Sequence, residues 1–245
     1  MTELRDEPFE VPVISSSTPF TGRVWNIRRD EVSYNGEPIV REYMDHTGAV
    51  AVLALDDDGR VLLIKQYRHP VRMREWEIPA GLLDVAGEDA LSAAQRELAE
   101  EADLTAARWD VLAEFFTSPG GSDEAIRIYL ARGLTAADEV FARDAEEADI
   151  EVRWAALDDV VDAVLARQLQ NPSLALGALA AHAARARDWS TLAPGDAPWP
   201  RRSRPIGAGS GFHPSQNPGI APDSDDSRRT KAADAGDAAT GEPAS

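Results

Sequence analysis

The segment Pro79–Leu104, "PAGLLDVAGEDALSAAQRELAEEADL", contains the change of hydrophobic periodicity on which the fold assignment rests. Its first residues end a short strand pattern, "EWEIPAG". Apolar side chains then recur at helical spacing, at Leu91, Ala94, Leu98 and Ala102. The segment therefore predicts an amphipathic helix over residues 88–102. We expect Glu88 and Asp89 in its first turn, where the helix dipole favours anions.

The predicted helix concentrates negative charge on one side. Glu97 and Glu101 fall one turn apart on the same face, with Glu100 beside them. Like charges at this spacing repel, and the only basic residue in the helix is Arg96. A solvated polar face is one interpretation. The alternative is an all-oxygen site for Mg²⁺ or Mn²⁺, formed by these carboxylates and a carbonyl of the adjacent "IPAG" turn.

Strand patterns lie on both sides of this helix. "VWNIRRDEVSYNGEPIVREYMDH" reads as two β segments joined through Asn35-Gly36, and "AVAVLALDDDGRVLLIKQYR" repeats the pattern around "DDDG". Further strands are predicted in "WDVLAEFFTSPG", "EAIRIYLARGL" and "DIEVRWAAL". An amphipathic helix follows over residues 157–165, and Asn171-Pro172 opens another. Strands around a helix, with helices at the end, predict an α+β sandwich.

Composition limits the classes of function. The chain has 245 residues and no cysteine, which excludes disulfides, thiolate metal sites and a thiol nucleophile. Its net charge of −18 argues against nucleic acid or an anionic membrane as partner. The first ten residues lack the pattern of a secretion signal, so we expect a cytoplasmic protein. From Arg201 onward the chain is nearly empty of large apolar side chains, which predicts a disordered tail.

The acidic segment resembles a known signature. In the Nudix hydrolases a glutamate is followed, after seven residues, by Arg-Glu-apolar-x-Glu-Glu, and this chain has Glu88, Arg96-Glu97-Leu98 and Glu100-Glu101 at those positions. Two departures occur at the ends of the helix. The loop between Gly81 and Glu88 is one residue longer than the signature, and Asp103 replaces the usual glycine. Aspartate can adopt the left-handed conformation expected there.

The resemblance extends from about residue 20 to about residue 185. "KQYRHPVRMREWEIPAGLLD", "SPGGSDE" and "AEEADIEV" look like the ADP-ribose pyrophosphatase branch of the family, most closely its actinobacterial members. This resemblance implies a Nudix α/β/α sandwich and hydrolysis of ADP-ribose to AMP and ribose 5-phosphate. It also implies a homodimer that exchanges N-terminal strands. We therefore expect an N-terminal β segment (1–45), a hydrolase domain (46–190) and a disordered C-terminal tail (191–245).

The resemblance also implies roles for individual residues. Metal ligation falls to Glu97, Glu101 and the carbonyl of Ala80, with Glu100 supporting the cluster, while Glu88 and Arg96 orient the glutamates. For the base that activates water we favour Glu146 over Glu147, both in a loop before the last strand. Candidate substrate-binding residues, each of which could instead be an ordinary surface, strand or turn residue, are Arg68, Arg72, Glu77, Ser118 and Gly120.

Two other functions remain open at this stage. One is hydrolysis of a different nucleoside diphosphate sugar. The other, from a different class, is a Nudix-like module that senses such a ligand without turnover. Degenerate modules of this kind usually lose signature glutamates, whereas this chain keeps all four.

Overall fold

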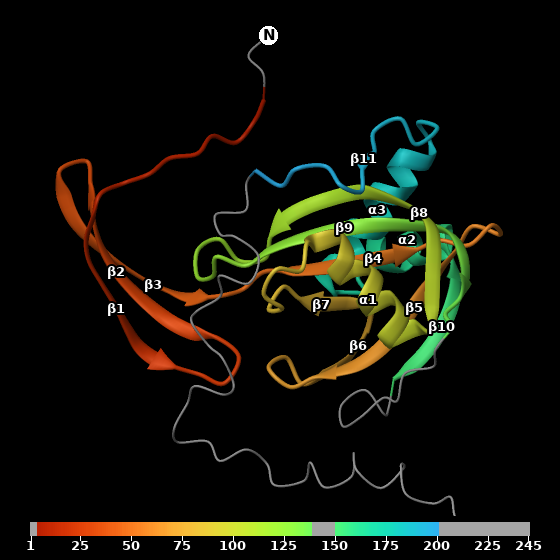
Figure 1. The fold of residues 1–245 in the computed structure, drawn as a ribbon, viewed down its shortest axis with the longest axis horizontal. Coiled ribbons are helices and arrows are strands. Elements are labelled where there is room, and N and C mark those ends of the chain that lie inside the picture. Colours follow the sequence, from red (N-terminus) through yellow and green to blue (C-terminus); the bar gives the residue numbers. More distant parts are fainter. Residues whose placement is uncertain (1–3, 139–149, 201–245) are drawn as a thin grey trace, which may run out of the picture. The chain divides into compact units, whose positions relative to one another are not determined.

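The computed structural model describes residues 4–138 and 150–200 (Figure 1). Its main sheet has five strands in the order β11-β8-β9-β4-β7, namely Ala193–Pro194, Leu104–Phe116, Ala125–Ala136, Ala49–Ala54 and Ala80–Leu82. A second sheet has the order β10-β5-β6, namely Glu151–Ala156, Arg60–Arg68 and Met73–Glu77. A third contains β1 (Val13–Thr21), β2 (Asn26–Tyr34) and β3 (Glu37–Asp45). The helices are α1 (Ala90–Ala102), α2 (Leu157–Leu165) and α3 (Pro172–Arg185).

The first predicted hairpin is confirmed. Asn35 and Gly36 have positive φ angles of 52° and 85°, as a two-residue turn of type I′ requires, and Tyr34 pairs with Glu37 across it. The "DDDG" turn also forms, because the amide of Gly59 donates to the carbonyl of Asp56 at 3.0 Å. The two apolar runs beside this turn, however, do not make a second hairpin.

Those runs are β4 and β5, which separate into different sheets after one isolated bridge between Leu55 and Val61. β4 pairs with β9 in parallel and with β7 in antiparallel orientation, so both of its edges are occupied. β5 instead pairs with β6 and β10. A strand with both edges paired has no backbone groups left for a third neighbour, which is why β5 belongs to another sheet.

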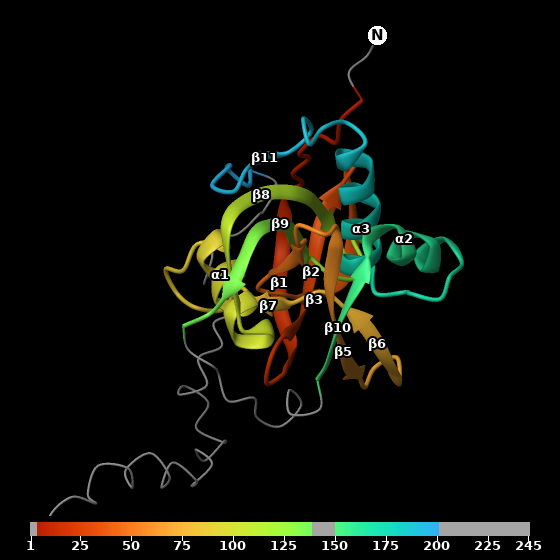
Figure 2. The same ribbon diagram turned by 90° about the vertical axis from the view of Figure 1, so that its right-hand side faces the viewer.

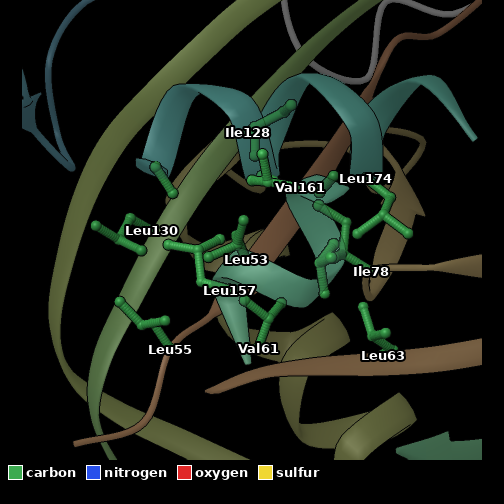
Figure 3. Packing of buried hydrophobic residues seen from close by; sticks show 14 of the residues in the cluster. Leu53, Leu55, Val61, Leu63, Ile78, Ile128, Leu130, Leu157, Val161 and Leu174 are labelled. Carbon is green, nitrogen blue, oxygen red and sulfur yellow. The ribbon is translucent and has the colours of Figure 1, made fainter. Parts of the chain in front are cut away.

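Every residue of β4 is buried, and its two faces belong to two core clusters. Leu53 and Leu55 pack with residues of α2 and α3, such as Leu157 and Leu174 (Figure 3). Val50 and Val52 pack with α1. Helices therefore cover both faces of the main sheet, with α1 and α3 on opposite sides of β9 in Figure 2. The predicted α/β/α sandwich is confirmed.

Helix α1 begins two residues later than the sequence predicts. Asp89 is its N-cap, with a side-chain oxygen that accepts from the amides of Leu91 and Ser92 at 2.9 Å each. Glu88 therefore precedes the helix instead of lying in its first turn. At the other end Asp103 adopts the left-handed conformation (φ 54°), as expected for a residue in the place of the usual glycine.

Residues 191–200 belong to the packed part of the molecule, so their assignment to a disordered tail is wrong. β11 pairs with Val111 and Asp110 of β8. Arg127, which is almost fully buried, donates to the carbonyls of Ala197 and Pro198 at 2.7 and 2.9 Å. The rest of the expected tail, residues 201–245, lies outside the described residues. Among the residues that are described, no helix is long and apolar enough to cross a membrane.

Candidate active site

Arg96 connects the glutamates of the signature segment. Its Nε and Nη2 atoms donate to the two carboxylate oxygens of Glu88, both at 3.0 Å. Its Nη1 atom donates to Glu97 at 2.6 Å and to Glu100 at 3.0 Å. The hydrogen bonds to Glu88, together with the charges of the other carboxylates, raise the pKa of Arg96, which stays a cation. The guanidinium thus fixes three carboxylates relative to one another.

The side chain of Glu97 lies in space left by a missing side chain on β7. A Cβ atom at Gly81 would lie 1.9 Å from Oε1 of Glu97 and 2.5 Å from its Cγ. Only glycine is therefore compatible with this position of the carboxylate. Burial raises the pKa of Glu97, and the neighbouring Arg96 opposes that shift. The longer loop after Gly81 does not remove this residue from the site.

Glu101 is buried, and both of its carboxylate oxygens accept hydrogen bonds. The amide of Ala80 donates to one at 2.9 Å, and the side-chain amide of Gln66 donates to the other at 3.2 Å. Ala80 lies beside the helix, as we expected from the sequence. The hydrogen bond to Glu101, however, uses the N–H group of Ala80, whereas the expected ligand was its carbonyl. Gln66 was not among the predicted residues. The position of Gln66 two residues after the apolar Ile64 could have indicated it, because alternate residues of a strand lie on the same face, here of β5.

This donor set fits a hard divalent cation in its chemistry, since it consists of carboxylates from adjacent turns of one helix. Glu97, Glu100 and Glu101 are the residues that would hold the ion. In the arrangement described for residues 4–138 and 150–200, no three acidic or histidine side chains already converge as a ligand cluster. A bound divalent ion would supply neutralisation of a diphosphate and acidification of a water molecule.

Two of the predicted substrate-binding residues contact each other. Arg68, at the end of β5, donates to both carboxylate oxygens of Glu77 in β6, at 2.7 and 2.6 Å. Glu77 is 2% exposed, so this bidentate pair satisfies a buried carboxylate. The hydrogen bonds that Arg68 donates to Glu77 raise the pKa of Arg68. Arg72 is exposed in the turn between β5 and β6, with φ 55°, and is not part of this pair.

The other predicted residues lie elsewhere or are not described. The carbonyl of Ser118 accepts from the amides of Gly121 and Ser122, both at 2.9 Å, so this segment forms a tight turn between β8 and β9. Gly120 lies in the same turn, which is joined to β3 by hydrogen bonds to Met44. These hydrogen bonds connect the turn to β3. Glu146 and Glu147 lie outside the described residues.

The fold and the glutamate cluster define a class of protein. Residues 45–175 match the family model described as NUDIX domain. The chain therefore belongs to the NUDIX domain family.

Three curated relatives are similar over most of this domain. The chain is 46% identical to the ADP-ribose pyrophosphatase of Mycobacterium tuberculosis over 171 residues, which is 69% of this chain and 82% of the relative. It is 36% identical to the ADP-ribose pyrophosphatase of Bacillus subtilis, covering 68% of this chain and 89% of the relative. It is also 39% identical to the methanol dehydrogenase activator of Bacillus methanolicus, covering 57% and 75% respectively.

A solved structure described as an ADP compounds hydrolase has a similar fold. The TM-score is 0.59, and the match covers 75% of this chain and 98% of that chain. Because the sequence identity is 20%, this likeness supports the fold alone.

Proposed function

We propose that this protein hydrolyses the pyrophosphate bond of ADP-ribose, adding water to give AMP and ribose 5-phosphate. The observation that carries the proposal is the 46% identity to an ADP-ribose pyrophosphatase over 82% of that relative's length. The Arg96-centred group of glutamates supports it, because a dinucleotide-like anion can approach a protein of net charge −18 only where cations intervene.

We assign the roles in this reaction as follows. Glu97 and Glu101 hold Mg²⁺ or Mn²⁺, with Glu100 in support. Glu88 and Arg96 keep the glutamates in place through the hydrogen bonds at 2.6–3.0 Å. The Arg68–Glu77 pair orients a guanidinium toward the substrate's charged groups. Glu146 accepts the proton from the attacking water, and Glu147 is the alternative base. Because Ser118 and Gly120 lie in a tight turn, we assign them only to the wall of the substrate pocket.

We also propose that the protein is a cytoplasmic homodimer in which residues 1–45 serve as the exchanged element. Every residue of β1 is exposed, including Val13, Ile14 and Phe20. A sheet of three strands with apolar side chains left in solvent is expected to be covered by another surface. Light scattering coupled to size-exclusion chromatography would test this. A monomeric full-length protein at micromolar concentration would contradict the proposed dimer.

The activity is tested by incubating the full chain with ADP-ribose and Mg²⁺ and measuring AMP, beside a panel of other nucleoside diphosphate sugars. ADP-ribose should give the highest kcat/KM. A higher value for another sugar nucleotide would move the assignment to that substrate. No turnover on the whole panel, with binding retained, would favour a ligand-sensing module.

The proposed ligands are tested by Glu97→Gln and Glu101→Gln. An amide is a poor ligand for a hard cation, so each variant should lose activity by orders of magnitude while its melting temperature stays close to that of the wild type. Near-normal turnover of either variant at limiting Mg²⁺ would show that its ligand assignment is wrong.

A further inference from the structure

His46 lies where three parts of the chain meet. It follows β3 directly and is 6% exposed. The ring of Trp25, which precedes β2, lies 5.3 Å from the imidazole between centroids, at an interplanar angle of 32°. His46 also contacts the end of the turn between β8 and β9, at Asp123 and Glu124. Burial of a polar ring costs free energy unless its nitrogens have partners, so the contacts of both nitrogens matter.

His46 contacts the turn between β8 and β9 through its backbone and its side chain. Its amide donates to Oδ1 of Asp123 at 2.8 Å. Its Nε2 atom lies 3.4 Å from Oε1 of Glu124. The other carboxylate oxygen of Glu124 accepts from the hydroxyl of Thr117 at 2.7 Å, so this side chain spans the turn. His46 is therefore joined to the turn that we assign to the wall of the substrate pocket.

The other ring nitrogen connects His46 to the segment beside the signature glutamates. Nδ1 accepts from the amide of Gly48 at 3.0 Å. The carbonyl of Gly48 in turn accepts from the amide of Leu83, also at 3.0 Å, at the start of the loop between β7 and α1. Leu83 comes two residues after Gly81, where the missing Cβ leaves room for Glu97. Two hydrogen bonds therefore lead from the imidazole to this loop.

The two contacts of the ring require one tautomer. Because Nδ1 accepts a hydrogen bond it carries no proton, so the proton of the neutral ring is on Nε2, beside Glu124. An aliphatic side chain offers neither group. An asparagine places an acceptor near the position of Nδ1 but does not reach that of Nε2. The imidazole thus joins the turn between β8 and β9 to the loop between β7 and α1.

We propose that His46 is a positioning residue, which fixes the turn between β8 and β9 relative to the loop between β7 and α1. It thereby sets the position of the pocket wall relative to the glutamates. This inference rests on the proposed hydrolysis of ADP-ribose, and His46 is assigned no contact with substrate. The glutamates have their own hydrogen bonds to Arg96 and to the amide of Ala80. Loss of the ring should therefore weaken substrate binding more than it slows the chemical step.

The first test is the His46→Asn variant of the full chain, which keeps an acceptor for Gly48 but removes the contact with Glu124. KM for ADP-ribose should rise by about 3-fold to 30-fold, as for other residues that couple two parts of a protein, while kcat changes by less than about threefold. A residue needed only for folding would instead lower the melting temperature and the apparent kcat with KM unchanged. His182→Asn, at an exposed histidine of α3, is the matched control and should keep both constants.

A second variant tests the same contact from the other side. Glu124→Gln removes the charge beside the ring without shortening the side chain, and should also raise KM. The double variant should raise KM no further than the single variants do, because each of them breaks the same contact. Hydrogen–deuterium exchange without substrate gives a measurement independent of activity. The amides of residues 117–124 should exchange faster in His46→Asn, and those of α1 should exchange as in the wild type.

The outcomes separate this inference from the function on which it rests. If the wild type hydrolyses ADP-ribose but His46→Asn raises KM by less than about threefold, the role of His46 is refuted and the proposed function stands. Unchanged exchange of residues 117–124 would refute that role equally. If His46→Asn does not fold, the same measurements on Glu124→Gln decide. If the wild type hydrolyses no ADP-ribose, the proposed function is wrong, and exchange alone decides whether His46 fixes the turn.

Discussion

Substitution of Gly81 by alanine tests the site most directly, because it moves one carboxylate with little change elsewhere. The added Cβ would lie 1.9 Å from Oε1, 2.0 Å from Cδ and 2.5 Å from Cγ of Glu97. Non-bonded heavy atoms ordinarily stay about 3.5 Å or more apart, so the carboxylate must move by roughly 1.5 Å. Gly81 has no positive φ, and alanine can adopt its backbone conformation. The collision with Glu97 is thus the main consequence.

Stability should change less than activity. Replacing glycine by alanine restricts the unfolded chain and stabilises the protein by about 0.4–1 kcal/mol. Displacing Glu97 weakens its hydrogen bond with Arg96, and such bonds to charged groups are worth about 1.5–3 kcal/mol. Because these effects oppose each other, we expect the free energy of unfolding to fall by no more than about 2.6 kcal/mol. Activity should respond far more strongly, since a misplacement of about 1 Å can cost about 100-fold in rate.

The assay compares kcat/KM for ADP-ribose and the unfolding free energy from urea denaturation in the same preparations. Gly121→Ala is the matched control, because a Cβ there would meet no atom within 4 Å. We expect that control to keep wild-type activity, and Gly81→Ala to lose about 100-fold. If Gly81→Ala retains full activity, the position of Glu97 beside β7 is not required for the reaction. Loss of folding in Gly81→Ala would instead show that the side chain of Glu97 cannot move aside.

Three further predictions concern other parts of the chain. Truncation after residue 200 should leave melting temperature and activity nearly unchanged. Truncation after residue 190 should lower the melting temperature by several degrees, because this shorter chain lacks β11 and two hydrogen-bond acceptors of the buried Arg127. Glu146→Gln should lower kcat by about 10²–10⁴-fold with little effect on Mg²⁺ affinity, and Glu147→Gln should lower kcat less. A larger loss of kcat in Glu147→Gln than in Glu146→Gln would make Glu147 the base. If kcat falls by less than about tenfold in both variants, Glu100 is the next residue to test. Asp89→Ala should cost about 1 kcal/mol of unfolding free energy at pH 7. Hydrogen bonds from Ser92 lower the pKa of Asp89. The stabilisation that the Asp89 carboxylate provides is therefore complete above the ordinary aspartate pKa and is lost as the pH falls through the lowered value. Urea denaturation should accordingly show a smaller difference in unfolding free energy between Asp89→Ala and the wild type at pH 3 than at pH 7.

Local pattern was sufficient for much of this protein. The Asn35-Gly36 hairpin, the left-handed Asp103 and the Asn171 N-cap of α3 follow from backbone preferences of a few adjacent residues. The helical spacing of apolar residues located α1 to within two residues of its start. The spacing of the signature glutamates and Arg96 likewise needed only one helix and the loop before it, since these residues are neighbours on its surface.

Contacts between distant segments were decided only by the tertiary structure. The separation of β4 and β5 into two sheets depends on which strands occupy the edges of β4, and no local pattern records that choice. The hydrogen bond between Gln66 and Glu101 joins residues 35 positions apart, and depends on the packing of β5 against α1. Burial of Arg127 beneath residues 197 and 198 spans about 70 positions. The sequence thus determined the elements and the chemistry of α1, while strand order and packing decided which side chains complete the site.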